Sequence, residues 1–166
     1  MKSSFEKVSE LNTLFGNRKG DLSEPDWGYI KGQVKLVIEE AEEMMEAVEN
    51  RDIVELMYAQ GDMTTVNDGV AHKAGFNSNT VYDIVHASNM TKLCRNSDEA
   101  DETLAYYHGL GIPVGNLEIQ GEYPQAAVKV VIDSHYREGG KEKYAPVGKF
   151  LKNVCWEEPD FTPVLL

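Results

Sequence analysis

The chain has 166 residues, of which 42% are hydrophobic and 27% charged, values that are ordinary for a single globular domain and argue against a largely disordered chain. A chain of this length buries enough surface to fold without disulfides or a structural metal. Its 28 acidic and 16 basic residues give a formal net charge of -12, which argues against binding duplex nucleic acid through phosphates. A phosphate-bearing small substrate remains compatible with this charge if a divalent cation lies between.

The N-terminus and the cysteines favour a cytoplasmic protein. The opening segment MKSSFEKVSELNTLF carries charges throughout and has no apolar core, so we do not expect a signal peptide. No apolar run approaches the roughly 18 residues of a membrane span, so we expect no membrane partner. Cys94 and Cys155 lie far apart without a CxxC pattern, as reduced thiols do. If a phage encodes the chain, the same reasoning places it in the host cytoplasm.

Two helices are predicted before residue 50. The first spans residues 4–15, where apolar positions recur at helical spacing, and Gly16 stops it. The second spans about residues 27–48 and ends at Asn50. Its apolar stripe follows the pattern of a buried helix face: Ile30, Val34, Val37, Ala41, Met44, Met45 and Val48. We expect this stripe to pack in the core.

Two further helices follow after short links. Asp52 is a good N-cap for a helix that runs to about Ala74 and ends at Gly75, and Glu55 stands where a capping box places its glutamate. A fourth helix spans residues 80–94. Four helices joined by short links predict a helical bundle.

The last third of the chain has a different pattern. Residues 98–108 predict a short fifth helix, and AAVKVVID (126–133) is rich in valine and isoleucine, as strands are. REGGKEKYAPVGK (137–149) is typical of a polar turn, and FLKNV (150–154) is the expected hairpin partner of the strand. We therefore predict a mainly α chain with a small C-terminal α+β appendage.

The predicted organisation is one domain over residues 1–166. Residues 1–95 form a four-helix core and residues 96–166 the appendage with its hairpin. There are no internal repeats and no low-complexity tracts.

The first chemical signal is VIEEAEEMMEAV, which makes Glu39, Glu40 and Glu43 neighbours on the second helix. Clustered carboxylates repel one another. A divalent cation turns this repulsion into a favourable interaction, because Mg²⁺ and Mn²⁺ bind carboxylate and phosphate oxygens together. A solvated acidic face is the alternative interpretation. The helix also carries a minor apolar stripe beside these glutamates: Tyr29, Leu36 and Ala47. A second helix packed there would enclose the carboxylates.

Asp62 is the second signal, because aspartate has poor propensity in mid-helix and apolar residues surround it. Glu55 lies seven residues earlier on the same face. For Glu55, the alternative is that it only completes the cap at Asp52.

The third signal is VHASNMTKLC, with His86, Asn89 and Lys92. Asn89 and Lys92 share a helix face, and an amide beside an ammonium suits phosphate oxygens. The alternative is an exposed helix end whose lysine interacts favourably with the helix dipole.

Four blocks in this order resemble the MazG-like all-α nucleotide pyrophosphohydrolases, more narrowly a phage and bacterial branch that is phosphoribosyl-ATP pyrophosphohydrolase-like. The blocks are EExxE, Asp62 followed by GVAHKAGF, then VHASNMTK, then GKFLKNVCWEEPDF. In that branch the last block holds a GKxxK element, an aromatic residue and a PD turn: here Gly148, Lys149, Lys152, Trp156, Pro159 and Asp160. The resemblance implies an all-α NTP pyrophosphatase-like helical bundle, with residues 1–95 as the catalytic core.

The resemblance also implies the chemistry. It implies hydrolysis of a (d)NTP to the (d)NMP and pyrophosphate, with Mg²⁺ or Mn²⁺, in a homodimer or homotetramer. By position, Glu40, Glu43 and Asp62 would hold metal, and Glu39 would orient or deprotonate the attacking water. The substrate-binding candidates are Asn89, Lys92 and His86, with Lys149 and Lys152 as weaker ones.

One position departs from the family pattern. The second acidic motif of the family is ExxD, but the residue three before Asp62 is Ala59. Glu55, about 10 Å along the helix axis from Asp62, is the candidate metal ligand in its place. Water, Asp68 or a lower metal count are the alternatives.

We therefore expect a metal-dependent nucleoside triphosphate pyrophosphohydrolase, such as a phage nucleotide-pool enzyme acting on a purine such as dGTP. A dUTP- or dCTP-type pyrophosphatase is one alternative, and a helical binding protein with a decayed site is another. Two apolar faces on the second helix favour a homo-oligomer, because one face packs within the chain and the other needs a partner.

Overall fold

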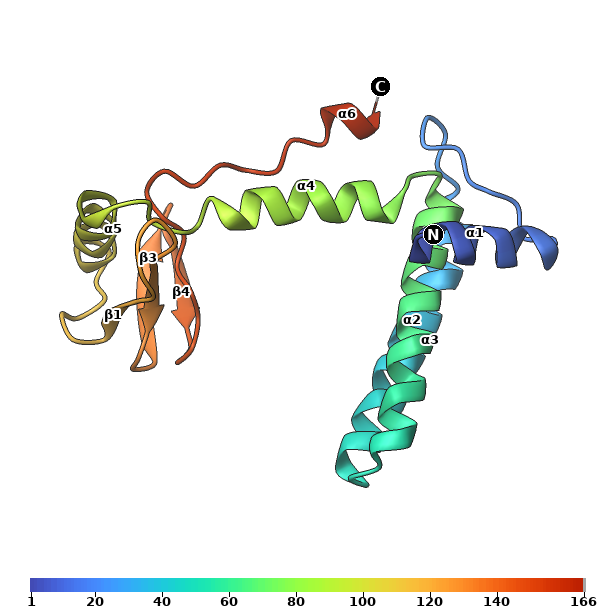
Figure 1. The fold of residues 1–166 in the computed structure, drawn as a ribbon, viewed down its shortest axis with the longest axis horizontal. Coiled ribbons are helices and arrows are strands. Elements are labelled where there is room, and N and C mark those ends of the chain that lie inside the picture. Colours follow the sequence, from blue (N-terminus) through green and yellow to red (C-terminus); the bar gives the residue numbers. More distant parts are fainter. Residues whose placement is uncertain (166) are drawn as a thin grey trace. The chain divides into compact units, whose positions relative to one another are not determined.

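The structure is a computed structural model and describes residues 1–165. Within these residues the chain is mostly helical, with two antiparallel hairpins near the C-terminus, which confirms the predicted mainly α class with a small strand region (Figure 1). The helices are α1 (Ser4–Leu14), α2 (Trp27–Glu49), α3 (Ile53–Ala74), α4 (Ser78–Met90), α5 (Ser97–Gly109) and α6 (Thr162–Leu165). The strands are β1 (Leu117–Gln120), β2 (Ala127–Val130), β3 (Ser134–Glu138) and β4 (Lys141–Ala145).

The chain divides into two compact units. The first comprises residues 1–83 with the C-terminal segment from residue 160, and the second comprises residues 84–159. The division falls inside α4, whereas the sequence suggested a boundary near residue 95. The physical reason is that the two ends of α4 have different partners: its first turn bonds to α1 and α3, and its last turn bonds to residue 157.

The first unit is built on the α2–α3 hairpin. The two helices pack along each other, and α1 packs on α3. The caps are those the sequence predicts: Asp52 accepts hydrogen bonds from the amides of Val54 and Glu55, and Gly75 ends α3 with a φ of 92°. In addition, a capping box between Ser3 and Glu6 starts α1, which the sequence analysis missed.

The face of α2 that packs on α3 differs from the predicted main stripe. Of that stripe only Ile30 is buried and Val37 and Met44 half-buried, while the other four members are exposed. The face that packs instead is rotated around the helix and includes two polar side chains: Ile30, Gln33, Val37, Glu40, Met44 and Ala47. A second helix, α3, packs beside Glu40, but only part of the predicted minor stripe lies under it, because Leu36 is exposed.

The four predicted helices do not all lie within one compact unit. The helix pairs with substantial contact are α2 with α3 and α1 with α3. The last turn of α4 instead belongs to the second unit. The helix–helix core of the first unit is therefore smaller than the sequence predicted, and apolar side chains stay exposed on α2 and α3.

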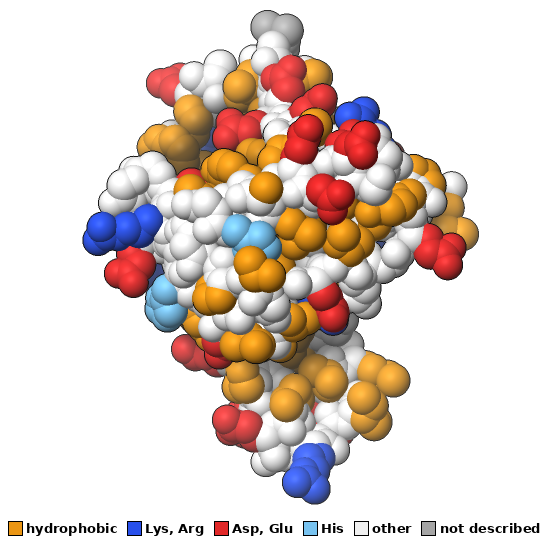
Figure 2. Space-filling model, turned by 90° about the vertical axis from the view of Figure 1, so that its left-hand side faces the viewer, with side chains coloured by type: hydrophobic (Ala, Val, Ile, Leu, Met, Phe, Trp, Pro, Cys, Tyr) orange, Lys and Arg blue, Asp and Glu red, His pale blue; other side chains and the backbone are white. Residues whose placement is uncertain are grey.

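The second unit has a closed hydrophobic core. α5 packs on β2. The core contains side chains from α5 and from each of the strands β1 to β4. Members with almost no exposure are Cys94, Ala100, Ile112, Val128, Val130, Ala145 and Leu151. Both cysteines are free, as expected. Outside this core, exposed hydrophobic side chains lie among acidic ones on the face drawn in Figure 2.

The strand pairing corrects two sequence predictions. Residues 137–149 are not a polar turn, because they contain the end of β3 and all of β4, joined by Gly139 and Gly140 with φ of 57° and 78°. Two glycines with positive φ make the tight hairpin turn. The predicted strand exists as β2, but its hairpin partner is β1 rather than residues 150–154. Those residues make a single bridge to it, between Lys129 and Phe150.

In residues 1–165, none of the helices combines the length and the apolar character that crossing a bilayer requires.

Candidate active site

The α2–α3 hairpin concentrates negative charge. Between residues 39 and 62 the chain has nine carboxylates and one cationic side chain, Arg51. The predicted catalytic and metal residues Glu39, Glu40 and Glu43 lie on α2, and the predicted ligands Glu55 and Asp62 lie on α3. The structure therefore brings two distant stretches of sequence into one acidic surface of the first unit.

Glu40 has unfavourable surroundings for a carboxylate. Its Oε2 atom is shielded from solvent and has no hydrogen-bond partner within the described part of the chain. Burial raises the pKa of Glu40 above 4.5, and the neighbouring charges of Glu43, Asp62 and Glu39 raise it further. Such an oxygen, buried without a donor among like charges, costs stability unless a cation compensates it.

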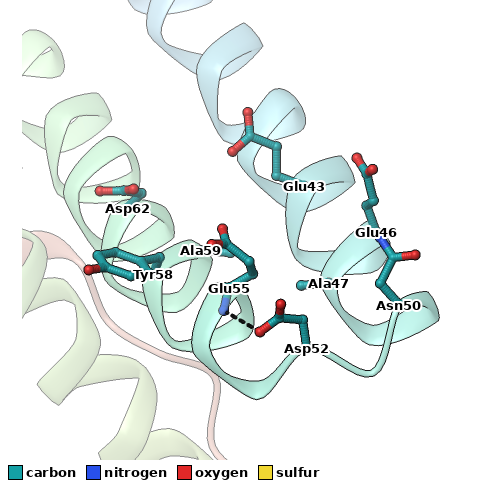
Figure 3. Close-up of a pocket in the computed structure, with 9 residues that line it drawn as sticks. All are labelled: Glu43, Glu46, Ala47, Asn50, Asp52, Glu55, Tyr58, Ala59 and Asp62. Carbon is teal, nitrogen blue, oxygen red and sulfur yellow. Dashed lines mark hydrogen bonds between the residues drawn. The ribbon is translucent and has the colours of Figure 1, made fainter.

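Next to these carboxylates lies a hollow of about 640 Å³. Nine residues of α2, α3 and their link line it: Glu43, Glu46, Ala47, Asn50, Asp52, Glu55, Tyr58, Ala59 and Asp62. Figure 3 shows Glu43 on α2 and Glu55 and Asp62 on α3 at this hollow. Ala47 and Ala59 are its buried members. The small side chain at residue 59, where the family motif has a glutamate, leaves this space open.

Glu55 does not complete the predicted capping box. The Asp52 side chain caps α3, but the Asp52 amide donates to the carbonyl of Ala47 at 2.9 Å. The Glu55 carboxylate is thus not needed to satisfy the Asp52 amide, and it is exposed at the hollow. The capping interpretation of this side chain loses its main support.

The donor set suits a hard divalent cation, because it consists of carboxylate oxygens with one buried oxygen lacking a donor. Within residues 1–165, however, no three His, Cys, Asp or Glu side chains are already placed to hold one ion together. Glu39, Glu43, Glu55 and Asp62 are exposed, so their side chains can turn without disturbing the core. Binding a cation therefore requires rotamer changes, which mutual repulsion of the carboxylates opposes until the cation is present.

The second predicted group lies at the end of α4, in the second unit. The Lys92 ammonium donates to Asn89 Oδ1 at 2.7 Å, so these two side chains form the predicted pair. His86 is on the same helix and exposed. An amide and an ammonium in contact offer adjacent donors for phosphate oxygens.

The structure joins this helix end to the block that follows the GKxxK element. Ser88 Oγ donates to the carbonyl of Glu157 at 2.7 Å, and the amide of Glu157 donates to Thr91 Oγ1 at 3.0 Å. Of these two hydroxyl side chains, Thr91 was missed in the sequence analysis, although it lies inside the SNMTK block. Their role is to tie two blocks that are some 65 residues apart.

The two weaker lysine candidates have different surroundings. Lys152 Nζ lies 3.1 Å from the centre of the Trp156 ring, a cation–π contact. Lys149 Nζ donates to the carbonyl of Tyr144 at 3.4 Å. Lys152 therefore sits against a ring that limits its mobility, whereas Lys149 is held only by one long hydrogen bond.

Comparison with known proteins gives one family. Residues 8–89 match the model of a family described as phosphoribosyl-ATP pyrophosphohydrolase. The match includes both acidic stretches and Asn89, and it ends before Lys92, Lys149 and Lys152. Neither the search of curated proteins nor the search of solved structures gave a match.

Proposed function

Over residues 8–89 the chain belongs to the phosphoribosyl-ATP pyrophosphohydrolase family, and from this premise we propose that it hydrolyses a nucleoside triphosphate between the α- and β-phosphates. The products are the nucleoside monophosphate and pyrophosphate. The observation that carries the proposal is the buried, unpartnered Oε2 of Glu40 inside a cluster of like charges. Carboxylates whose pKa is raised by burial and by neighbouring negative charges are found often at functional sites.

We assign the metal to the α2–α3 hairpin. Glu40, Glu43 and Asp62 would hold Mg²⁺ or Mn²⁺, and Glu39 would orient the attacking water or accept its proton. When bound, the cation neutralises charge between carboxylates and phosphates and acidifies the attacking water. Without such neutralisation, the net charge of -12 would repel a triphosphate.

Glu55 is proposed to take the place of the acidic side chain that is missing at residue 59. Both residues line the same hollow and lie one helical turn apart on α3. A glutamate side chain one turn away can reach the space that a side chain at residue 59 would occupy. The exposed Glu55 carboxylate and the cap formed by Asp52 alone support this assignment.

Asn89 and Lys92 are proposed to bind phosphate oxygens, and Lys92 to stabilise charge on the departing pyrophosphate. Their contact holds both donors in one orientation. His86, Lys149 and Lys152 are further substrate-binding candidates. The phage-type branch stays a prediction from the sequence motifs, as does a purine such as dGTP as substrate, with dUTP or dCTP as alternatives.

We also propose that the protein works as a homo-oligomer, most simply a dimer. Val34, Ile38, Met45 and Val48 recur at helical spacing on α2 and are exposed. All of them except Ile38 belong to the predicted core stripe. On α3 four more large apolar side chains are exposed: Ile53, Val54, Met57 and Tyr58. A second copy would bury this apolar surface, and a closed symmetric dimer is the commonest such arrangement.

A binding protein with a decayed site is the second candidate, and Ala59 is the observation that favours it. A test that separates the candidates uses a panel of common NTPs and dNTPs with Mg²⁺ or Mn²⁺. Pyrophosphate and phosphate are measured separately, with EDTA as the control. We expect monophosphate and pyrophosphate from at least one nucleotide and no reaction in EDTA. Release of phosphate with a diphosphate, or no hydrolysis of any nucleotide, would contradict the proposal.

A further inference from the structure

α5 buries three polar side chains on one face. Glu99, Thr103 and Tyr107 lie four residues apart, and their exposed fractions are 9%, 0% and 3%. Residues at this spacing form one stripe along a helix. Buried polar groups need hydrogen-bond partners, so the partners of this stripe show what it is for.

All three side chains reach the segment of residues 152–154. The Tyr107 hydroxyl donates to the carbonyl of Lys152 at 3.2 Å. Thr103 Oγ1 accepts from the amide of Val154 at 3.2 Å. Glu99 Oε2 accepts from Asn153 Nδ2 at 3.1 Å. The stripe therefore holds each residue of a three-residue segment that begins at Lys152, the last residue of the GKxxK element.

Asn153 extends the network to the end of α4. Its side chain is buried, and Nδ2 also donates to the carbonyl of Leu93 at 3.1 Å, the residue after Lys92. Its Oδ1 accepts from the amide of Cys155 at 3.1 Å. The backbone around Lys152 is thus fixed to α5 on one side and to the residue next to Lys92 on the other.

The charge of Glu99 keeps this network intact at neutral pH. Arg95 donates to it from its side chain at 2.7 Å and from its backbone at 2.9 Å. These hydrogen bonds, with that of Asn153, lower the pKa of Glu99 to about 2. The carboxylate therefore stays ionised and remains an acceptor for Asn153.

Lys152 itself faces a hollow of about 500 Å³ in the second unit. Eight other residues line it: Tyr106, Tyr107, Glu138, Lys143, Asn153, Val154, Trp156 and Glu158. Two lysines and two glutamates therefore share this hollow, and Lys143 is paired with Glu138. The Lys152 ammonium lies over the Trp156 ring, so a normally mobile side chain is ordered before any ligand binds. An ordered lysine loses less conformational entropy when it binds an anion than a freely rotating one.

We propose that Glu99, Thr103 and Tyr107 are positioning residues that fix Lys152 for binding the pyrophosphate portion of the substrate. This inference rests on the proposed function. Glu99 and Thr103 do not line the hollow and act through residues 152–154, while Tyr107 lines it and also holds the Lys152 carbonyl. A merely structural stripe would support the fold equally but would show no coupling to Lys152 in anion binding.

The test measures binding of inorganic pyrophosphate with Mg²⁺ by calorimetry in the full chain. Tyr107→Phe removes only the hydroxyl that donates to the Lys152 carbonyl, and Thr103→Val is the second, more disruptive variant. The matched control is Tyr136→Phe, a buried tyrosine that packs edge-on against Tyr107 in the same core. We expect Tyr107→Phe to weaken binding about five- to tenfold, because Lys152 is then held less firmly, and the control to leave it unchanged.

A double-mutant cycle shows whether the effect passes through Lys152. Lys152→Met should weaken binding at least as much as Tyr107→Phe, and the double variant should bind no worse than Lys152→Met alone. Additive losses would overturn the inference, because the hydroxyl would then act independently of Lys152. Wild-type affinity in both Tyr107→Phe and Thr103→Val would also overturn it, while leaving pyrophosphate release, and with it the proposed function, intact. If the wild type neither binds nor releases pyrophosphate, the proposed function fails as well.

Trp156 gives a readout that needs no ligand. In a Trp27→Phe background the emission of Trp156 alone is observed. We expect Tyr107→Phe to shift this emission to longer wavelength and to increase its quenching by acrylamide, because residues 152–156 become more mobile. Unchanged emission and quenching would contradict the positioning role.

Discussion

Glu40 and Glu99 are two shielded carboxylates on helices of different units, and their surroundings are opposite. Glu99 accepts hydrogen bonds from Arg95 and Asn153, and its pKa falls to about 2. Glu40 has an oxygen without a donor and three acidic neighbours, and its pKa rises above 4.5. The first arrangement is complete within the chain. The second is unfavourable as it stands, and a bound cation would make it favourable, which is why we propose the metal site there.

The same contrast holds for the two units as wholes. The unit of residues 84–159 has eleven acidic and eight basic residues and a closed apolar core, whereas the other has seventeen acidic and eight basic residues. The acidic unit also leaves large apolar side chains exposed on α2 and α3. Excess charge and uncovered apolar surface both cost free energy in isolation. We infer that the acidic unit needs partners, a cation and a second copy, that the other unit does not.

If the acidic unit needs a cation, the largest effect of removing a proposed ligand is on catalysis. Asp62→Asn removes one proposed ligand from an exposed position, so the fold should persist while kcat/KM falls by about a hundredfold or more. Pyrophosphate release measures the effect. Glu42→Gln, an exposed glutamate of α2 outside the hollow, is the matched control and should keep full activity. Equal activity of Asp62→Asn and the control would remove the metal assignment.

The next effect concerns Glu55. Since Asp52 caps α3 by itself, Glu55→Gln should leave the melting temperature unchanged. If Glu55 takes the place of the missing acidic residue, activity should fall by about ten- to a hundredfold, with a higher Mn²⁺ concentration needed for half-maximal rate. Full activity at wild-type Mn²⁺ concentrations would show that the site works without this carboxylate.

The exposed apolar stripe predicts an effect on assembly. Ile38, 54% exposed, and Met57, 67% exposed, would be buried by a second copy. Ile38→Lys or Met57→Lys should therefore weaken the dimer by about 2 kcal/mol or more, seen as monomer in sedimentation at micromolar protein. Val114→Lys, at an 85% exposed position of the other unit, should not change the mass. A wild-type chain that is an active monomer would contradict the proposed oligomer.

The charge of Glu40 predicts opposite effects of one substitution with and without cation. In EDTA, Glu40→Gln removes a poorly solvated charge from an acidic cluster and should not lower the melting temperature. Mn²⁺ should stabilise the wild type by about 2.7 kcal/mol at a hundredfold excess over its Kd. The variant should gain much less. Thermal melts in EDTA and in Mn²⁺ measure both effects, and an equal gain in the two proteins would place the ion elsewhere.

The smallest effect is the acid stability given by Glu99. Its pKa is lowered from 4.5 to about 2 in the folded chain, so its stabilisation is complete above pH 4.5 and is lost as the pH falls toward 2. Glu99→Gln should therefore remove part of the decline in stability between these pH values. Denaturant unfolding of wild type and variant across this range tests it. Parallel pH profiles would show that Glu99 is not preferentially ionised in the folded chain.

The sequence by itself was enough for the features that depend on neighbouring residues. The two ends of α3 could be predicted, because a cap depends only on residues next to the helix. Asp52 caps the start with its side chain, and Gly75 ends the helix with a positive φ. Helical spacing alone predicts that Glu39, Glu40 and Glu43 are neighbours on α2. The three-residue spacing of Asn89 and Lys92 likewise predicts their contact at the end of α4. The polar hairpin of β3 and β4 was missed because its strands lack alternating apolar residues, although Gly139 and Gly140 carried a turn signal.

Tertiary structure decided which faces meet. α2 carries two apolar patterns, and the face that packs on α3 takes Ile30 from one and Ala47 from the other, which spacing along α2 does not predict. The choice left Val34 and Ile38 outside and Glu40 partly inside. Likewise, nothing near Glu99 or Thr103 in sequence predicts a partner at Asn153, because that contact depends on a return of the chain 50 residues later. Local spacing sets the order of side chains along a helix, but burial is a property of what packs against it.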